Sequence, residues 1–274
     1  MRKKISIAAV ISCLSLSLSA QTYEEYVDAG NQAVAADSLA KAEMLYKSAL
    51  RLSPTDYRNP LTYSNLAKVQ QAQGQNEKAI DSYTMALNLV PQNVPILMSR
   101  ANLFMALGNY SKALVDYKNV IDVAPNNIDA LQYAAYIFTK QRDYAKAKTH
   151  YERLLAIDPD NYAALLGVAV LFQECGKPAD AMARLTLLAE KYPDRAEIYS
   201  MRAEMEAEAN QPELAIMDLN KAIELAPNDR NMILTRGYIH YNQRNYRLAR
   251  KDFERAIELG VPRVQLKSEL KKCK

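Results

Sequence analysis

Histidine and cysteine, the side chains that most often carry catalysis or bind metals, are rare in this sequence: two histidines and three cysteines among 274 residues. His150 and His240 are far apart, and neither Cys175 nor Cys273 has a second cysteine or a histidine at the spacing of metal ligands. The acidic residues are dispersed, and we find no glycine-rich phosphate loop and no nucleophile elbow. We therefore predict that the protein is not an enzyme and binds no metal and no cofactor.

Charged residues do recur in one fixed arrangement. Three arginines are each followed sixteen residues later by an aspartate: Arg100 with Asp116, Arg202 with Asp218, and Arg236 with Asp252. A guanidinium and a carboxylate can form two parallel hydrogen bonds, and a half-buried arginine needs such a partner. We predict three structural ion pairs, each joining the two helices of one repeat unit.

The helices that position these pairs come from an internal repeat. Its prolines are Pro54 and Pro91, 37 residues apart, followed at intervals of 34 residues by Pro125, Pro159, Pro193 and Pro227. When each unit is numbered so that its proline falls at position 32, position 20 is alanine in seven units: Ala42, Ala79, Ala113, Ala147, Ala181, Ala215 and Ala249. Position 24 is always large and apolar, as in Tyr46, Leu185 and Phe253. This spacing is typical of the buried face of an α-helix.

The first half of each unit carries a second apolar stripe, as in Leu97, Ala101 and Phe104, so each unit is predicted to contain two amphipathic helices. Between them lie residues that tolerate a left-handed backbone: Gly74, Gly108, Gly176 and Asn210. The residues placed to begin second helices are Pro178 and Pro212, and those placed to cap first helices are Asn127 and Asp229.

This pattern resembles the tetratricopeptide repeat over residues 23 to about 259. The resemblance implies an all-α fold, a right-handed superhelical solenoid of seven helix-turn-helix repeats with units starting near residues 23, 60, 94, 128, 162, 196 and 230. The array is expected over 21–261, followed by a short C-terminal capping helix over 262–274. Two features depart from the family pattern: the chain has no tryptophan, and Leu185 occupies a position that is usually aromatic.

The resemblance also implies that the first helices line a concave groove. The candidate partner-binding residues on these helices are Met98, Asn102, Met105, Tyr136, Leu166, Val170, Glu204, Glu208, Leu234, Tyr238, Tyr241 and Asn242. Exposed aromatic and methionine side chains beside amides are typical of protein recognition. The alternative is that some of these side chains pack against the neighbouring unit.

We therefore expect a non-enzymatic scaffold that binds a partner protein or peptide in the groove. Two alternatives stay open: a structural subunit of an envelope complex that binds through its convex face or ends, and an exported glycan-binding protein. Nucleic acid is not expected as a partner, because without Arg2, Lys3 and Lys4 the chain has 32 basic and 31 acidic residues. A homo-oligomer formed through a terminal face of the array is a further expectation.

Residues 1–20 have the features of a secretory signal peptide: a basic start, an apolar stretch and the small residue Ala20. We therefore expect an exported protein, located in the periplasm of a bacterial cell and beginning at Gln21 after cleavage. The alternative is "VISC" at residues 10–13, which resembles a bacterial lipoprotein box and would make Cys13 a lipidated N-terminus of an outer-membrane lipoprotein. Membrane association is expected only in that case.

Overall fold

The regular structure is entirely helical. The computed structural model describes residues 21–273, which contain fifteen α-helices, one short 3-10 helix and no strand. The predicted all-α fold is confirmed. The predictions for the signal peptide and for Cys13 lie outside the described residues. No described helix combines the length and the apolar character needed to cross a membrane.

Helices alternate as first and second members of hairpins, as the repeat predicts. The first helices are α1 (Tyr23–Ala35), α3 (Asn59–Ala72), α5 (Val94–Ala106), α7 (Ile128–Lys140), α9 (Tyr162–Glu174), α11 (Ala196–Glu208) and α13 (Arg230–Asn242). The second helices are α2 (Leu39–Leu52), α4 (Asn76–Leu89), α6 (Tyr110–Val123), α8 (Tyr144–Ile157), α10 (Pro178–Lys191), α12 (Pro212–Leu225) and α14 (Tyr246–Glu258). Each first helix begins within one residue of its predicted unit start.

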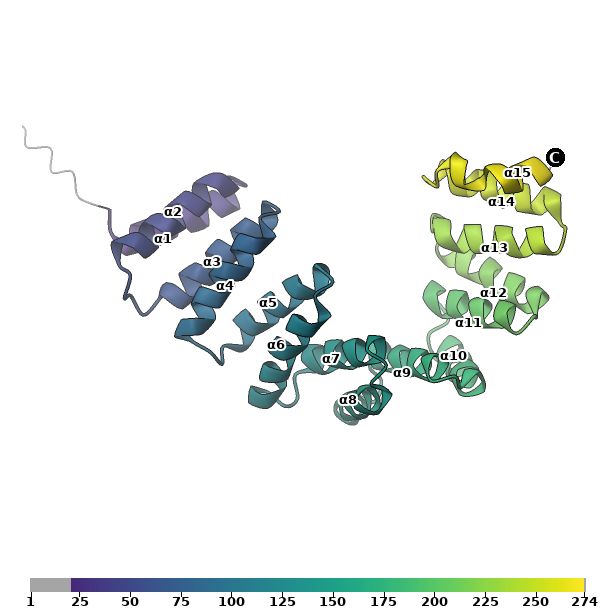
Figure 1. Cartoon of the computed structure of the whole chain (residues 1–274), viewed down its shortest axis with the longest axis horizontal. Helices are drawn as coiled ribbons and strands as arrows, with labels where there is room; N and C mark the ends of the chain where they lie inside the picture. The colour runs from purple at the N-terminus through teal and green to yellow at the C-terminus, as the bar shows by residue number, and fades with distance from the viewer. Residues whose placement is uncertain (1–20, 274) are drawn as a thin grey trace, which may run out of the picture. The chain divides into compact units, whose positions relative to one another are not determined.

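The chain divides into two units, the first ending at Leu103 and the second beginning at Phe104, within α5. In the first unit, α1 packs against α2, α2 against α3, and α3 against α4, so the two hairpins lie side by side (Figure 1). Their core is made of small and large apolar side chains in contact, including Ala42, Tyr46 and Leu66.

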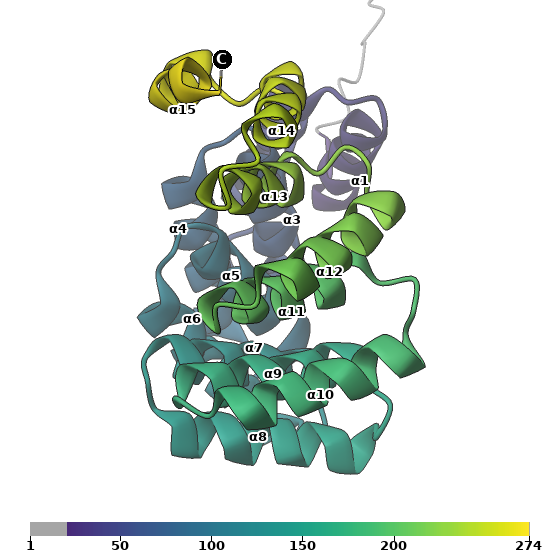
Figure 2. The ribbon, with the colours of Figure 1, turned by 90° about the vertical axis from the view of Figure 1, so that its right-hand side faces the viewer.

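In the second unit, consecutive helices from α6 to α14 pack in the same way, and Figure 2 shows α11 to α14 as successive layers. The core again lies between neighbouring helices, for example where Ala215 and Leu219 of α12 meet Met232 of α13. This consecutive packing of helix pairs is the arrangement of tetratricopeptide solenoids.

Helix starts follow the predicted caps. The Asn127 side chain accepts a hydrogen bond from the Ala130 amide at 2.9 Å, and the Asp229 side chain accepts one from the Asn231 amide at 2.8 Å. Each bond satisfies an amide that has no partner within its own helix. Pro178 is the first residue of α10, where a missing N–H costs little.

The turn inside every hairpin passes through a left-handed residue at position 15. The seven residues with positive φ at this position are Asp37, Gly74, Gly108, Arg142, Gly176, Asn210 and Arg244. The sequence pattern predicts four of them, and the other three are Asp37, Arg142 and Arg244. The hairpin geometry therefore imposes this conformation even on residues for which it is unfavourable.

Helices cross closely because small residues recur on both partners. All seven alanines at position 20 are fully buried, and position 8 of the first helices is alanine or glycine. At Gly30 of α1, an added Cβ would lie 2.6 Å from Cε1 of the Tyr46 ring. The large side chain at position 24 thus fills the space that position 8 leaves open.

The segment predicted as one capping helix has two parts. It forms the 3-10 helix η1 (Arg263–Leu266) and then the short α15 (Lys267–Lys272). Leu266 and Cys273 are buried against Phe253 of α14, so this segment covers the last apolar face. Cys175 and Cys273 are both free thiols.

Candidate functional site

Two of the three expected ion pairs are present in the second unit. Arg202 Nη2 donates to Asp218 Oδ1 at 2.7 Å, and Arg236 Nη2 donates to Asp252 Oδ1 at 2.7 Å. The hydrogen bonds that Arg202 donates to the Asp218 carboxylate raise the pKa of Arg202 above its ordinary value. Each pair joins the two helices of its own hairpin and is mostly buried, as a structural ion pair requires.

The third expected pair, Arg100 with Asp116, has one residue in each unit and stays a prediction. Arg100 also donates through Nη1 to Thr84 Oγ1 of the preceding helix at 2.9 Å.

Neither histidine belongs to a metal-binding group of described residues. His150 Nδ1 lies 2.8 Å from the Lys146 carbonyl oxygen, and its ring packs 5.1 Å from the Phe138 ring. His240 is buried, and burial lowers its pKa. No group of three or more possible ligands capable of holding a metal ion occurs within residues 21–273.

Four of the predicted groove residues come together around one pocket of the second unit. Met105, Tyr136, Leu166 and Val170 line a pocket of about 510 Å³, which we call the tyrosine pocket. The other lining residues are Tyr110, Gln132, Tyr133, Thr139, Lys140, Tyr151, Tyr162, Ala163 and Gly167. Five tyrosines therefore surround a space large enough for part of a peptide chain.

The tyrosine rings contact one another and a cation at the pocket wall. Tyr110 and Tyr136 meet edge to face with centroids 6.3 Å apart, and Lys140 Nζ lies 5.6 Å from the Tyr136 centroid. Tyr162 packs edge to face on Tyr192 at 5.1 Å. Tyr136 is 38% exposed, so its ring remains available to a ligand.

Three of the phenols that line the tyrosine pocket have raised pKa values and keep their protons at neutral pH. Burial raises the pKa of Tyr136, that of Tyr151 to about 12, and that of Tyr162 as well. The Tyr162 hydroxyl is buried and has no hydrogen-bond partner among the described residues. Neutral hydroxyls beside aromatic faces suit an uncharged apolar side chain together with peptide carbonyls.

A glycine makes room for one of these rings. Gly167 of α9 lies against Tyr151 of α8, and a Cβ at that position would overlap the Tyr151 ring atoms. Gly167 therefore lets Tyr151 lie between α8 and α9 at the wall of the pocket.

The other predicted groove residues do not line this pocket. Met98 and Asn102 lie in the first unit. Glu204 and Glu208 are exposed on α11. Partial desolvation and the negative charge of Glu208 both raise the pKa of Glu204.

In the last hairpin, two of the candidate groove side chains pack into the core, which is the alternative to binding a partner. Leu234 and Tyr241 pack against the core that contains Phe253. Tyr238 is 36% exposed and meets the Phe253 ring edge to face at 5.2 Å. Asn242 is exposed at the end of α13.

Of the five tyrosines of the pocket, the sequence prediction includes only Tyr136. It missed Tyr133 and Tyr162 of first helices as well as two that come from second helices. Tyr110 begins α6. Tyr151 occupies position 24, which the repeat pattern predicts to be part of the core. Gly167 of α9 is the feature of the sequence that could have indicated that the Tyr151 ring needs extra space.

Comparison with known proteins identifies the family. Tetratricopeptide repeat profiles match residues 62–93, 94–127, 138–205, 196–229 and 231–259. The chain belongs to the tetratricopeptide repeat family, and the resemblance noted in the sequence is confirmed.

Solved structures show the same architecture. A tetratricopeptide repeat protein from Parabacteroides merdae has 28% sequence identity and a TM-score of 0.78, and the match covers 93% of this chain and 99% of that one. YrrB, described as a TPR protein with an unusual peptide-binding site, has 18% identity, a TM-score of 0.52, and coverage of 68% and 94%. Pseudomonas aeruginosa pilF has 20% identity, a TM-score of 0.55, and coverage of 62% and 77%. The latter two show a shared fold only, and the search of curated proteins gives no match.

Proposed function

We propose that this protein is a non-catalytic scaffold that binds an extended segment of a partner protein in the tyrosine pocket. The observation that carries the proposal is the convergence of Met105, Tyr136, Leu166 and Val170 on one cavity of about 510 Å³. Tetratricopeptide repeats are in general protein-interaction modules, and the peptide-binding site described for YrrB is consistent with this use of the fold.

The chemistry of the pocket defines the part of the partner that it accepts. Leu166 and Val170 offer an apolar wall, and the protonated tyrosines offer hydroxyl donors. An aliphatic or aromatic side chain would bury its surface there, while the flanking backbone carbonyls accept hydrogen bonds from the phenols. Aromatic residues in a pocket of this kind dominate binding energy at protein interfaces.

The cellular setting is part of the same proposal. We infer export to the periplasm from residues 1–20, so the partner would be another protein of the bacterial envelope. Lipidation at Cys13 is the alternative, and the mass of the mature N-terminus in the native host distinguishes the two.

Site-specific photocrosslinking tests the pocket directly. A benzoylphenylalanine introduced in place of Tyr136 is expected to crosslink a partner in the native envelope, and mass spectrometry would identify the crosslinked segment. The control places the same crosslinker at Tyr57, which is 86% exposed and remote from the pocket in the sequence.

Binding with purified partner then measures the contribution of the pocket. Tyr136→Ala is expected to weaken affinity by about 2 kcal/mol or more, whereas Tyr57→Ala leaves it unchanged. Equal crosslinking at both positions, or equal affinity of both variants, would show that the partner binds elsewhere. Binding of saccharides but of no protein would favour the glycan-binding alternative.

A further inference from the structure

The C-terminal end of the second unit carries a surface rich in cations that the proposed function does not use. Two hollows share Arg250 of α14. One, of about 500 Å³, is lined by Arg250, Arg263, Val264, Lys267, Leu270 and Lys271. The other, of about 570 Å³, is lined by Ile223, Pro227, Ile233, Arg236, Arg247, Arg250, Lys251, Asp252, Glu254, Arg255 and Glu258. We call the two together the basic surface.

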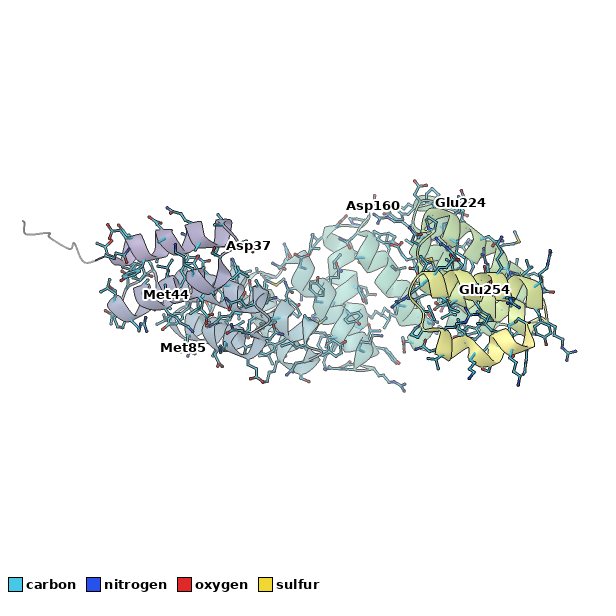
Figure 3. All side chains as sticks on the ribbon, turned by 90° about the horizontal axis from the view of Figure 1, so that it is seen from above. Asp37, Met44, Met85, Asp160, Glu224 and Glu254 are labelled. Atoms are coloured by element: carbon cyan, nitrogen blue, oxygen red, sulfur yellow. The ribbon has the colours of Figure 1, made fainter. Side chains whose placement is uncertain are left out.

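Every acid that lines the basic surface already has a cationic partner. Asp252 pairs with Arg236 at 2.7 Å, Glu254 with Arg250 at 3.0 Å, and Glu258 with Arg255 at 3.0 Å. Figure 3 labels Glu254 among the side chains of α14. Each carboxylate that lines this surface is therefore already in an ion pair.

Five further cations of the basic surface form no ion pair with any described residue. They are Arg247, Lys251, Arg263, Lys267 and Lys271, and all five are exposed. Several like charges that form no ion pair raise the local potential and attract an anionic partner. Without Arg2, Lys3 and Lys4 the chain has 32 basic and 31 acidic residues, so the overall charge balance does not reveal this local excess.

The first hollow also presents apolar surface between its cations. Val264 is 77% exposed, and Leu270 is only partly buried beside it. An exposed valine in a hollow that is also lined by lysines and arginines suits a partner that carries both carboxylates and aliphatic side chains. A hollow of this size accepts protruding side chains better than it accepts a flat surface.

We propose that the basic surface is a second docking site, which binds an acidic segment of a partner protein with aliphatic residues between its carboxylates. The segment would place an aliphatic side chain against Val264 and Leu270, and its carboxylates beside Lys267, Lys271 and Arg263. This site is distinct from the tyrosine pocket, because the two share no lining residue.

Peptide binding to the full chain tests the proposal. The probe is a fluorescein-labelled peptide in which pairs of glutamates alternate with single leucines, and anisotropy reports its binding. We expect the double substitution Lys267→Glu/Lys271→Glu to weaken binding about tenfold or more, and added salt to weaken binding to the unmodified chain. The charge-matched control is Lys41→Glu/Lys118→Glu, at two exposed lysines outside the basic surface, which is expected to change binding by less than about twofold.

Three results would overturn the proposal. Equal weakening by both double substitutions would show a response to net charge alone. Equal binding of a peptide with glutamine in place of glutamate would show that carboxylates are not recognised. Binding to vesicles of phosphatidylcholine and phosphatidylglycerol without binding to the acidic peptide would assign the surface to lipid. If the double substitution Lys267→Glu/Lys271→Glu lowers the melting temperature, the variant Lys267→Gln/Lys271→Gln is tested in its place, and it too is expected to weaken peptide binding about tenfold or more.

Discussion

Arg236 and Asp252 are joined by two parallel hydrogen bonds, from Nε to Oδ2 at 2.9 Å and from Nη2 to Oδ1 at 2.7 Å. Arg236 also donates through Nη1 to Asn220 Oδ1 of the preceding helix at 2.6 Å. One guanidinium thus connects α12, α13 and α14. The pair therefore helps to set how one hairpin stacks on the next.

Removing only the acid of this pair is expected to be costly. The Asp252 side chain is 6% exposed and that of Arg236 is 21% exposed, so Asp252→Ala would leave a largely buried cation with one neutral partner. We expect a loss of about 3 kcal/mol in the free energy of unfolding. The double substitution Arg236→Met/Asp252→Leu is expected to recover most of this loss, because it removes both charges. Urea denaturation of the single and double variants measures the difference, and a single variant as stable as the unmodified protein would contradict a structural role.

His240 is expected to make stability depend on pH. Burial lowers its pKa below the ordinary value of 6.5, despite the nearby Asp252 carboxylate, and its Nδ1 has no hydrogen-bond partner among the described residues. As pH falls below about 6.5, the unfolded chain takes up a proton that the folded chain does not, so the free energy of unfolding falls.

Replacing this histidine tests the effect. Phenylalanine occupies the same repeat position at Phe104, Phe138 and Phe172. His240→Phe is expected to raise the free energy of unfolding by about 1 kcal/mol, because it removes a buried unpaired nitrogen. Melting temperatures across acidic pH should fall less steeply in the variant than in the unmodified protein. Parallel curves would assign the acid sensitivity to other groups.

The repeat pattern predicted the fold well because one steric requirement recurs at each hairpin. Alanine at position 20 and a large side chain at position 24 are imposed by closely crossing helices, so they leave a regular trace, as at Ala147 and Tyr151. The caps at Asn127 and Asp229 are likewise local, since each side chain bonds an amide two or three residues away.

The pocket was less predictable because it depends on register between helices. The stripe on the first helices indicated Tyr136 and Leu166, which do lie together. Periodicity alone could not show that the Tyr151 ring reaches the pocket past Gly167, nor that Tyr241 packs on the last core. A large apolar residue at position 24 indicates burial in every unit, but it does not show which of these rings also borders a cavity.

The left-handed turn residues give a prediction of stabilisation. Arg142 has φ of 60°, a conformation that costs a residue with a Cβ roughly 1–2 kcal/mol. Arg142→Gly is expected to raise the free energy of unfolding by about 0.5–1 kcal/mol, the gain being reduced by the greater freedom of glycine in the unfolded chain. Thermal and urea unfolding check the change.

Gly176→Ala is the matched control for Arg142→Gly, because it adds a Cβ at a left-handed turn residue where Arg142→Gly removes one. Gly176 has φ of 70° and nothing within 4 Å of an added Cβ, so Gly176→Ala tests backbone strain without a clash. We expect it to lower the free energy of unfolding by about 1 kcal/mol. Opposite effects from these two variants would establish the conformational cause, and effects of the same sign would refute it.

Gly167 and Tyr151 provide a test that couples packing to the tyrosine pocket. Gly167→Ala would force its Cβ into the Tyr151 ring, which is only 4% exposed and cannot easily move away. We expect a loss of about 1–3 kcal/mol in the free energy of unfolding. Tyr151→Leu removes the ring and places at position 24 the residue found there at Leu185 and Leu219. The double variant Gly167→Ala/Tyr151→Leu should therefore be more stable than the sum of the two single effects predicts, and a double-mutant cycle measures this coupling. Strict additivity would show that the glycine is not there to make room for the ring.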